Sequence, residues 1–334
     1  MVLFKMSFCR LIVVIIMTKK PLEKIRVIFM GSPDAAVKVL AALNEDERIE
    51  VPLVITKPDK PRGRAQKVII AKIKQYALDH GIKVFQPDLI NIEESLAYVD
   101  TFDSDLIFLI GYGKILGQEL LNLPRYGCIN LHGALLPKYR GPAPIQASIL
   151  HGDTETGITY MAMDEGLDTG DIIDQVKIKI KKNETADELQ LRLANLVAKS
   201  VAQVIVDYVS GKLIAKPQDK SQATYCHILN RDDGKIDWTE DAKSIHDKIR
   251  AYTSWPGAFT YLDGHRLKIL QAEPHQQMAK QKPGVFFLKD DKEPAVACGS
   301  GYLSLKKLQL EGKKAISGEE FARGYGRLAL TRCR

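Results

Sequence analysis

Asn130 and His132 are the residues of this chain whose types and spacing most clearly suggest chemistry. They stand two apart in an apolar run from Cys128 to His132. If that run is a strand, both side chains leave the same face, because side chains alternate along a strand. A carboxamide beside an imidazole combines a hydrogen-bond donor with a general base. The structural alternative is a histidine held by a core hydrogen bond beside an asparagine that starts a turn.

The residues that follow this pair are typical of an exposed loop. Gly133 leads into a stretch rich in turn residues, Pro137-Lys138-Tyr139-Arg140-Gly141-Pro142. Sites in open parallel sheets form at the carboxyl ends of strands. We expect the pair to lie at such an end, and this placement favours chemistry over the structural alternative.

Length, charge and cysteine content narrow the class of protein. A chain of 334 residues fits about two domains. The net charge of +7 is compatible with a polyanionic partner, although a solvated basic surface gives the same number. The five cysteines are odd in number and scattered, which indicates neither a disulfide framework nor a zinc site. We therefore expect a cytoplasmic protein without a metal.

The first residues have some features of a signal peptide but lack others. Leu11 to Met17 is an apolar run between basic flanks, but it is far shorter than the roughly 20 residues of a spanning helix. No small-x-small cleavage site follows, and Met17 opens a plausible start. We expect residues 1–23 to be an extra segment outside the fold, disordered or ahead of the true start, and we expect no membrane association.

Strand-like and helix-like patterns alternate over residues 24–211. Apolar strands are predicted at 26–30, 51–55, 105–110, 128–132 and 157–163. A first helix is predicted to begin at Pro33 with Ser32 as its cap, and a long one to follow the capping box Thr185 to Glu188. Such units indicate a doubly wound, Rossmann-like parallel sheet. The G-x-G-x-x-G fingerprint is absent after the first strand, which disfavours a nicotinamide enzyme.

The pattern changes after Gly211. Residues 212–230 are predicted to be a polar linker, and a helix is expected at 242–252. Short alternating runs with frequent turns follow, and Asp263-Gly264 between two of them is a hairpin signal. We predict a second, all-β domain of the OB-like barrel type at 231–334.

Four segments together resemble a known family. The run I-N-L-H-G-A-L-L-P-K-Y-R-G-P-A-P-I-Q, residues 129–146, resembles the signature of folate-dependent formyltransferases, and it is most similar to that of the methionyl-tRNA formyltransferases. G-S-P-D at 31–34, the basic loop T-K-P-D-K-P-R-G-R at 56–64 and G-L-D-T-G-D at 166–171 resemble further motifs of that family. The resemblance runs from about Arg26 to about Leu310.

The resemblance implies a set of site residues. The implied catalytic residues are Asn130, His132 and Asp168, although L-D-T-G-D alone could be an ordinary aspartate turn. The implied folate-binding residues are Gly111, Tyr112, Gly113, Ile115, Leu135, Leu136 and Pro137. The implied tRNA-binding residues are Lys60, Arg62, Arg64 and Lys67.

The resemblance also implies a reaction. A monomeric enzyme of this kind transfers the formyl group of 10-formyltetrahydrofolate to the α-amino group of methionine on initiator methionyl-tRNA. Two alternatives stay open: a formyltransferase acting on a purine precursor or an amino sugar, and a non-catalytic RNA-binding protein. The basic loop and the C-terminal β domain argue against the first, and the intact Asn/His/Asp set argues against the second. Residues 225–231 depart from the family pattern, which has a lysine there, so that basic role is not assigned to one residue.

Overall fold

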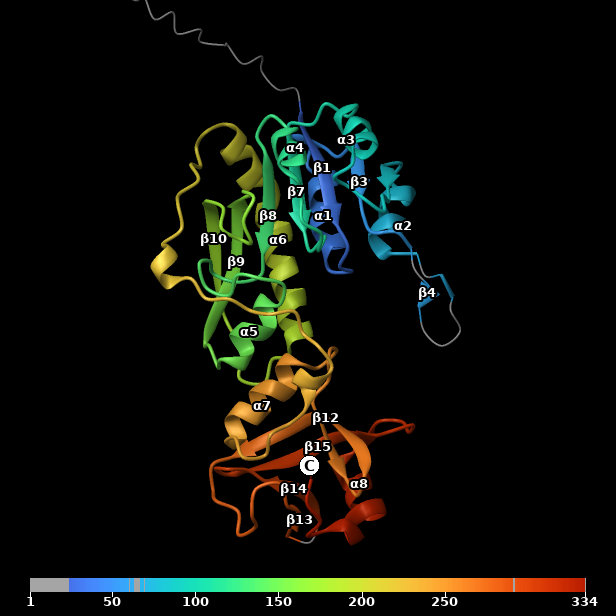
Figure 1. Ribbon diagram of the computed structural model, residues 1–334, viewed down its shortest axis with the longest axis vertical. Coiled ribbons are helices and arrows are strands. Elements are labelled where there is room, and N and C mark those ends of the chain that lie inside the picture. Colours follow the sequence, from blue (N-terminus) through green and yellow to red (C-terminus); the bar gives the residue numbers. More distant parts are fainter. Residues whose placement is uncertain (1–23, 60, 63–66, 69, 291, 334) are drawn as a thin grey trace, which may run out of the picture.

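The computed structural model describes residues 24–59, 61–62, 67–68, 70–290 and 292–333. Figure 1 shows an α/β part above a smaller β part, with a linker between them. The expectations for residues 1–23, and those for Lys60 and Arg64, lie outside the described residues.

The α/β part is built on one sheet with the order β10-β9-β8-β7-β1-β3-β6. Its parallel strands include β1 (Ile25–Gly31), β3 (Leu53–Ile55), β6 (Lys83–Phe85), β7 (Leu106–Ile110) and β8 (Cys128–His132), and the two-residue β2 (Ile49–Glu50) pairs with β1. Strands β1 and β7 lie in the middle and are buried on both faces, which explains why they are apolar except for Arg26 near the start of β1. The predicted parallel α/β fold is confirmed.

Two strands at one side of the sheet depart from the predicted parallel arrangement. β9 (Glu155–Ala162) runs antiparallel to β8, and β10 (Ile172–Lys179) runs antiparallel to β9. The connection at residues 163–171 is shorter than the dozen or so residues that a parallel crossover needs, so β9 and β10 form a hairpin. Asp168 therefore lies in a hairpin loop that folds back over β8, and it does not follow the end of a parallel strand.

Helices cover both faces of the sheet. On one face α1 (Ala36–Asn44) and α6 (Ala186–Val209) pack on inward side chains of β1 and β7 such as Phe29 and Phe108. On the other face the core includes Ile28, Ile107 and residues of α3 (Glu93–Asp100) and α4 (Gln118–Asn122). The remaining helices are α2 (Lys72–Asp79) and α5 (Pro144–Leu150).

The two predicted helix starts have different outcomes. The capping box of α6 is present between Thr185 and Glu188, as predicted. The prediction for α1 is wrong by one turn: the helix begins at Ala36, because a turn closed by the bond from Ala36 N–H to the Pro33 carbonyl intervenes. By length and composition α6 is the one described helix able to cross a membrane, and in this structure it packs its apolar stripe against the sheet and α1.

The second part is an antiparallel half-barrel. Its sheet has the order β11-β12-β15-β14-β13, and β16 pairs with β15. The bounds are α7 (Ala242–Ala251), β11 (Phe259–Leu262), β12 (His265–His275), β13 (Phe286–Lys289), β14 (Glu293–Ala297), β15 (Tyr302–Leu310), β16 (Ile316–Ser317) and α8 (Gly318–Tyr325), with single 3-10 turns at Lys220–Gln222, Asp232–Gly234 and Gly326–Leu328. Asp263 and Gly264 have φ of 50° and 78° and form the predicted hairpin turn. The expected all-β second domain is confirmed, but β11 and β13 do not pair, so the sheet of the described residues is open.

Candidate active site

The structure brings Asn130, His132 and Asp168 together. Asn130 and His132 alternate with Leu131 on β8, so they leave the same face as predicted. The Asn130 amide lies 3.4 Å from Asp168 Oδ1, and His132 Nδ1 lies 3.6 Å from Asp168 Oδ2. The His132 side chain is 5% exposed and that of Asp168 is 13% exposed, so the contact between them is shielded from bulk water.

A carbonyl fixes the tautomer of His132. Nε2 lies 2.8 Å from the carbonyl oxygen of Tyr139, which can only accept a hydrogen bond. The neutral ring therefore carries its proton on Nε2 and leaves the lone pair of Nδ1 facing Asp168. Nδ1 is the atom that can take a proton from a substrate.

Two influences oppose each other at the imidazole. Burial lowers the pKa of His132 below its ordinary value of 6.5, while the Asp168 carboxylate and the Tyr139 carbonyl raise it. The net direction is downward, so the ring is neutral at pH 7 and is available as a base. Asp168 stabilises the imidazolium once the proton has been taken.

The Asp168 loop is held from two sides. Asp168 has a φ of +52°, which is unusual for a residue with a side chain. Its Oδ2 accepts a 2.8 Å hydrogen bond from the backbone N–H of Gly141. Its carbonyl accepts a 2.9 Å hydrogen bond from Gln218, in the linker. These bonds aim the carboxylate at Asn130 and His132.

The loop after β8 is anchored on β9. Thr159, which is fully buried, donates to the carbonyl of Ala134 and accepts from the N–H of Leu136. Gln175 of β10 donates to the carbonyl of Leu136 and to Thr159. Neither residue was identified from the sequence, because each is one polar residue in an ordinary strand pattern.

The seven predicted folate-binding residues fall in two loops. Gly111 and Gly113 follow β7 with positive φ, Tyr112 between them is 2% exposed, and Ile115 is 84% exposed. Leu135, Leu136 and Pro137 lie in the loop after β8, with Leu136 buried. The Lys57 ammonium sits against Gly113, where an added Cβ would lie 2.9 Å from Nζ. The folate assignment stays a prediction.

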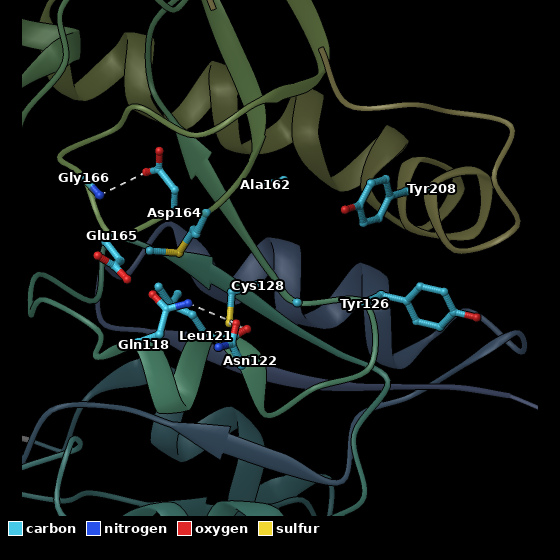
Figure 2. A pocket seen from close by; sticks show the side chains of 12 residues that line it. Gln118, Leu121, Asn122, Tyr126, Cys128, Ala162, Asp164, Glu165, Gly166 and Tyr208 are labelled. Atoms are coloured by element: carbon cyan, nitrogen blue, oxygen red, sulfur yellow. Dashed lines mark hydrogen bonds between the residues drawn. The ribbon is translucent and has the colours of Figure 1, made fainter. Parts of the chain in front are cut away.

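A cavity of about 580 Å³ adjoins the catalytic loop. Figure 2 shows Asp164, Glu165 and Gly166 of the β9–β10 loop on one side and Gln118, Leu121 and Asn122 of α4 on another. Tyr126 and Tyr208 lie at the far end, and Cys128, the first residue of β8, lines the cavity between them. Burial raises the pKa of the Cys128 thiol to about 12, so this thiol is not a nucleophile at neutral pH. None of the seven predicted folate residues lines this cavity.

The predicted tRNA-binding loop follows β3. Its described backbone forms a short hairpin of β4 (Pro61–Arg62) and β5 (Lys67–Val68), in which Arg62 pairs with Lys67. Lys60 and Arg64 lie outside the described residues, and the tRNA assignment stays a prediction. Among the residues that the structure describes, no group of three or more His, Cys, Asp or Glu side chains could hold a metal ion.

Comparison with known proteins identifies the class. A family model described as "Formyl transferase" matches residues 23–205, and one described as "Formyl transferase, C-terminal domain" matches residues 228–326. The chain therefore belongs to the formyl transferase family, and it is a transferase.

Individual relatives and solved structures show which members of the family this chain resembles. The chain is 40% identical over 301 residues to the methionyl-tRNA formyltransferase of Geobacter sulfurreducens, an alignment that covers 90% of this chain and 94% of the relative. Among solved structures, the methionyl-tRNA formyltransferase from Clostridium thermocellum matches with a TM-score of 0.56 at 17% identity, covering 88% of this chain and 100% of that one. An N-formyltransferase from Helicobacter canadensis in complex with folinic acid and dTDP-3-aminofucose matches with a TM-score of 0.61 at 20% identity, covering 84% of this chain and 99% of that one. At these identities the solved structures support the fold alone.

Proposed function

We propose that this formyltransferase transfers the formyl group of 10-formyltetrahydrofolate to the α-amino group of methionine on initiator methionyl-tRNA, in the cytoplasm and as a monomer. The observation that carries the proposal is the assembly of Asn130, His132 and Asp168 in a chain 40% identical to a methionyl-tRNA formyltransferase over 90% of its length.

The reaction needs a base and an oxyanion donor. The amine nitrogen attacks the formyl carbon on N10 of the folate, forming a C–N bond and a tetrahedral oxyanion. Asn130 donates a hydrogen bond to that oxyanion. In comparable sites such a donor lowers the activation barrier by about 3 kcal/mol. His132 Nδ1 takes the amine proton and then gives it to N10 as the C–N10 bond breaks, which leaves the enzyme unchanged.

Asp168 stabilises the charged intermediate form of this base. While His132 is neutral, its Nδ1 lone pair faces a carboxylate and no hydrogen bond joins them. Once Nδ1 is protonated, the 3.6 Å contact becomes an ion pair in a buried setting. Charge therefore develops where the site is already arranged to receive it.

We place the flat ring of the folate in the cavity beside the catalytic loop. Its volume of about 580 Å³ lies in the range of small-molecule sites. Asp164 and Glu165 line it and can accept hydrogen bonds from the amino and ring N–H groups of a pterin. The loops at 111–115 and 135–137 then hold the remainder of the donor next to Asn130.

We place the tRNA acceptor end against the basic loop from Lys57 to Lys67. This loop carries the proposed contacts Lys60, Arg62, Arg64 and Lys67. Lysine and arginine at the edge of the site can neutralise phosphates and position the acceptor end. The C-terminal half-barrel supplies further contacts to the sugar-phosphate backbone of the RNA.

One incubation distinguishes the candidate functions. Donor labelled in its formyl group is offered with methionyl-tRNA, with a purine-precursor amine and with a nucleotide-linked amino sugar. We expect label on methionyl-tRNA alone. Label on a small amine would support the small-molecule alternative, and tRNA binding without any transfer would support the non-catalytic one.

A further inference from the structure

The linker between the two domains returns to the catalytic site. Figure 1 shows it passing beside β10 before it reaches the C-terminal domain. Lys216 forms a two-way backbone bridge with Ile172 of β10. Further on, Thr224 and Cys226 bond the backbone of Arg140, and the Thr224 hydroxyl accepts from the N–H of Tyr139. These contacts clamp the segment that carries the carbonyl partner of His132.

One buried side chain of this linker contacts the catalytic loop directly. The amide nitrogen of Gln218 donates to the carbonyl of Asp168 at 2.9 Å and to the carbonyl of Gly170 at 2.7 Å. Its carbonyl oxygen accepts from Nη2 of Arg140 at 2.7 Å and from Nε at 3.2 Å. Gln218 is 8% exposed and Arg140 is 3% exposed, so water does not readily replace these bonds.

These bonds close a ring around the catalytic carboxylate. Gln218 holds the Asp168 carbonyl on one side, while the N–H of Gly141 holds the Asp168 carboxylate on the other. Arg140 joins the two halves, because it bonds Gln218 through its guanidinium and precedes Gly141 in the chain. Gly141 has a φ of +117°, and a Cβ there would lie 2.3 Å from the Cys226 carbonyl, so the linker can close over this loop only at a glycine.

We propose that Gln218 is a positioning residue of the formyltransferase site, which acts by holding the Asp168 loop so that the carboxylate faces His132 and Asn130. Asp168 has a left-handed backbone conformation, which is uncommon for a residue with a side chain, and hydrogen-bond partners hold its orientation. Gln218 is the one described side chain that donates to both the Asp168 and Gly170 carbonyls. The proposal rests on the proposed function only in assuming that Asp168 acts on His132.

The proposal makes Gln218 act through Asp168, and a double-mutant cycle tests this. Gln218→Met keeps the length of the side chain and removes its hydrogen bonds. We expect it to lower kcat by about 10- to 100-fold. In an Asp168→Asn background the same change should cost less than about threefold, since the carboxylate it positions is already gone. Equal losses in both backgrounds would overturn the proposal.

Two further variants guard against a general folding defect. Gln222→Met, on the same linker, removes a side chain whose contact is local, to Asp219, and it should leave kcat within about twofold of the wild type. Gln218→Glu keeps an oxygen that accepts from Arg140, but it replaces the donating amide with a carboxylate oxygen that faces the carbonyls of Asp168 and Gly170. It should therefore lose as much activity as Gln218→Met while the Arg140 contact survives. If Gln218→Glu were fully active, the two donated bonds would have no positioning role.

The titration of His132 supplies a readout that needs no acceptor. If Gln218→Met lets the Asp168 carboxylate move away, His132 loses the influence that raises its pKa. We expect the pKa of His132, followed by NMR of the ring-labelled protein without substrates, to fall below that of the wild type. An unchanged pKa of His132 in the Gln218→Met variant would overturn the positioning role. If the pKa falls as expected but the wild-type enzyme does not formylate methionyl-tRNA, only the proposed function is overturned.

Discussion

At the residue scale, the mechanism depends on one nitrogen atom. The carbonyl of Tyr139 accepts the proton on Nε2 of His132, which leaves Nδ1 as the base. Asp168 lies too far from Nδ1 for a good hydrogen bond, so its role is electrostatic, and the tautomer is set by the backbone.

The pH dependence should follow from the buried imidazole. His132 must be neutral to act as a base, so kcat/KM should fall as the pH drops through its pKa, which lies below 6.5. Asp168→Asn removes an influence that raises this pKa, so the acidic limb of the profile should move to lower pH while the maximum rate falls. The measurement is kcat/KM from pH 5 to 8 for both proteins, and a limb that moved to higher pH would contradict the assignment.

The oxyanion donor should affect the rate without affecting RNA binding. Asn130→Ala should lower kcat by about 100- to 1000-fold, since a lost oxyanion donor is felt only in the transition state. The affinity for methionyl-tRNA should change little. Asn195→Ala, on the outer surface of α6, is the matched control. Nearly normal turnover of the Asn130 variant at saturating substrates would remove it from the mechanism.

At the element scale, the central strands and the long helix α6 could be predicted from the sequence, whereas β6, β10 and the connections could not. β8 matches its predicted bounds, and the capping box of α6 is present, because apolar periodicity and caps are local signals. The direction of β9 depends on the connection at 133–154, and that of β10 depends on the short loop at 163–171. The role of Gln218 depends on contacts about 50 residues apart in the chain, for which the sequence carries no local signal.

The candidate site shows the same division. The prediction that Asn130 and His132 leave the same face of a strand is confirmed, because the alternation of side chains along a strand depends only on local sequence. Asp168 was implied by the resemblance alone, and the structure brings it to the site through a hairpin loop in which its backbone is left-handed. Tyr139 could not be identified because it contributes a backbone carbonyl, which any residue type provides.

The basic hairpin after β3 should act on the RNA substrate. Arg64→Ala should reduce kcat/KM for methionyl-tRNA far more than it reduces folate affinity. It should also make the fall of log kcat/KM with log salt less steep, by about one unit of slope, if one phosphate contact is lost. The exposed Lys199→Ala on α6 is the control. An unchanged kcat/KM across the salt series would make this loop an ordinary solvated surface.

At the scale of the whole molecule, a charge cluster around the buried Asp247 and Arg250 ties the two domains together. Asp247 of α7 bonds Arg250 at 2.9 Å and Lys243 at 2.7 Å, and Arg250 donates to the carbonyl of Glu184 at the start of the α6 region. Helix α7 also packs on α5. The half-barrel is thereby fixed to the catalytic domain, so a tRNA held by one can reach the other.

This cluster should make stability depend on pH. Burial alone would raise the pKa of Asp247, but hydrogen bonds from His246, Lys243 and Arg250 outweigh it and lower the pKa to about 2. A lowered carboxylate pKa gives stability that is present above 3.8 and is lost as the pH falls toward 2, up to about 2 kcal/mol.

Breaking the cluster tests this account. Asp247→Ala leaves Arg250 buried without its carboxylate and should cost about 3 kcal/mol at pH 7. The acid-dependent loss of stability should also become smaller. Denaturant unfolding at pH 7 and at pH 2.5 measures both effects, with the exposed Asp100→Ala as control. A loss below about 0.5 kcal/mol would show that the cluster does not hold the domains together.

The central claim is that the imidazole on β8 moves the proton during formyl transfer to methionyl-tRNA. The most direct test is the single-turnover rate of transfer of labelled formyl from 10-formyltetrahydrofolate to methionyl-tRNA by the wild type, by His132→Ala and by the surface control His80→Ala. We predict a loss of at least about 100-fold for His132→Ala, with tRNA affinity retained and His80→Ala unaffected. A rate for His132→Ala within about threefold of the wild type would contradict the mechanism.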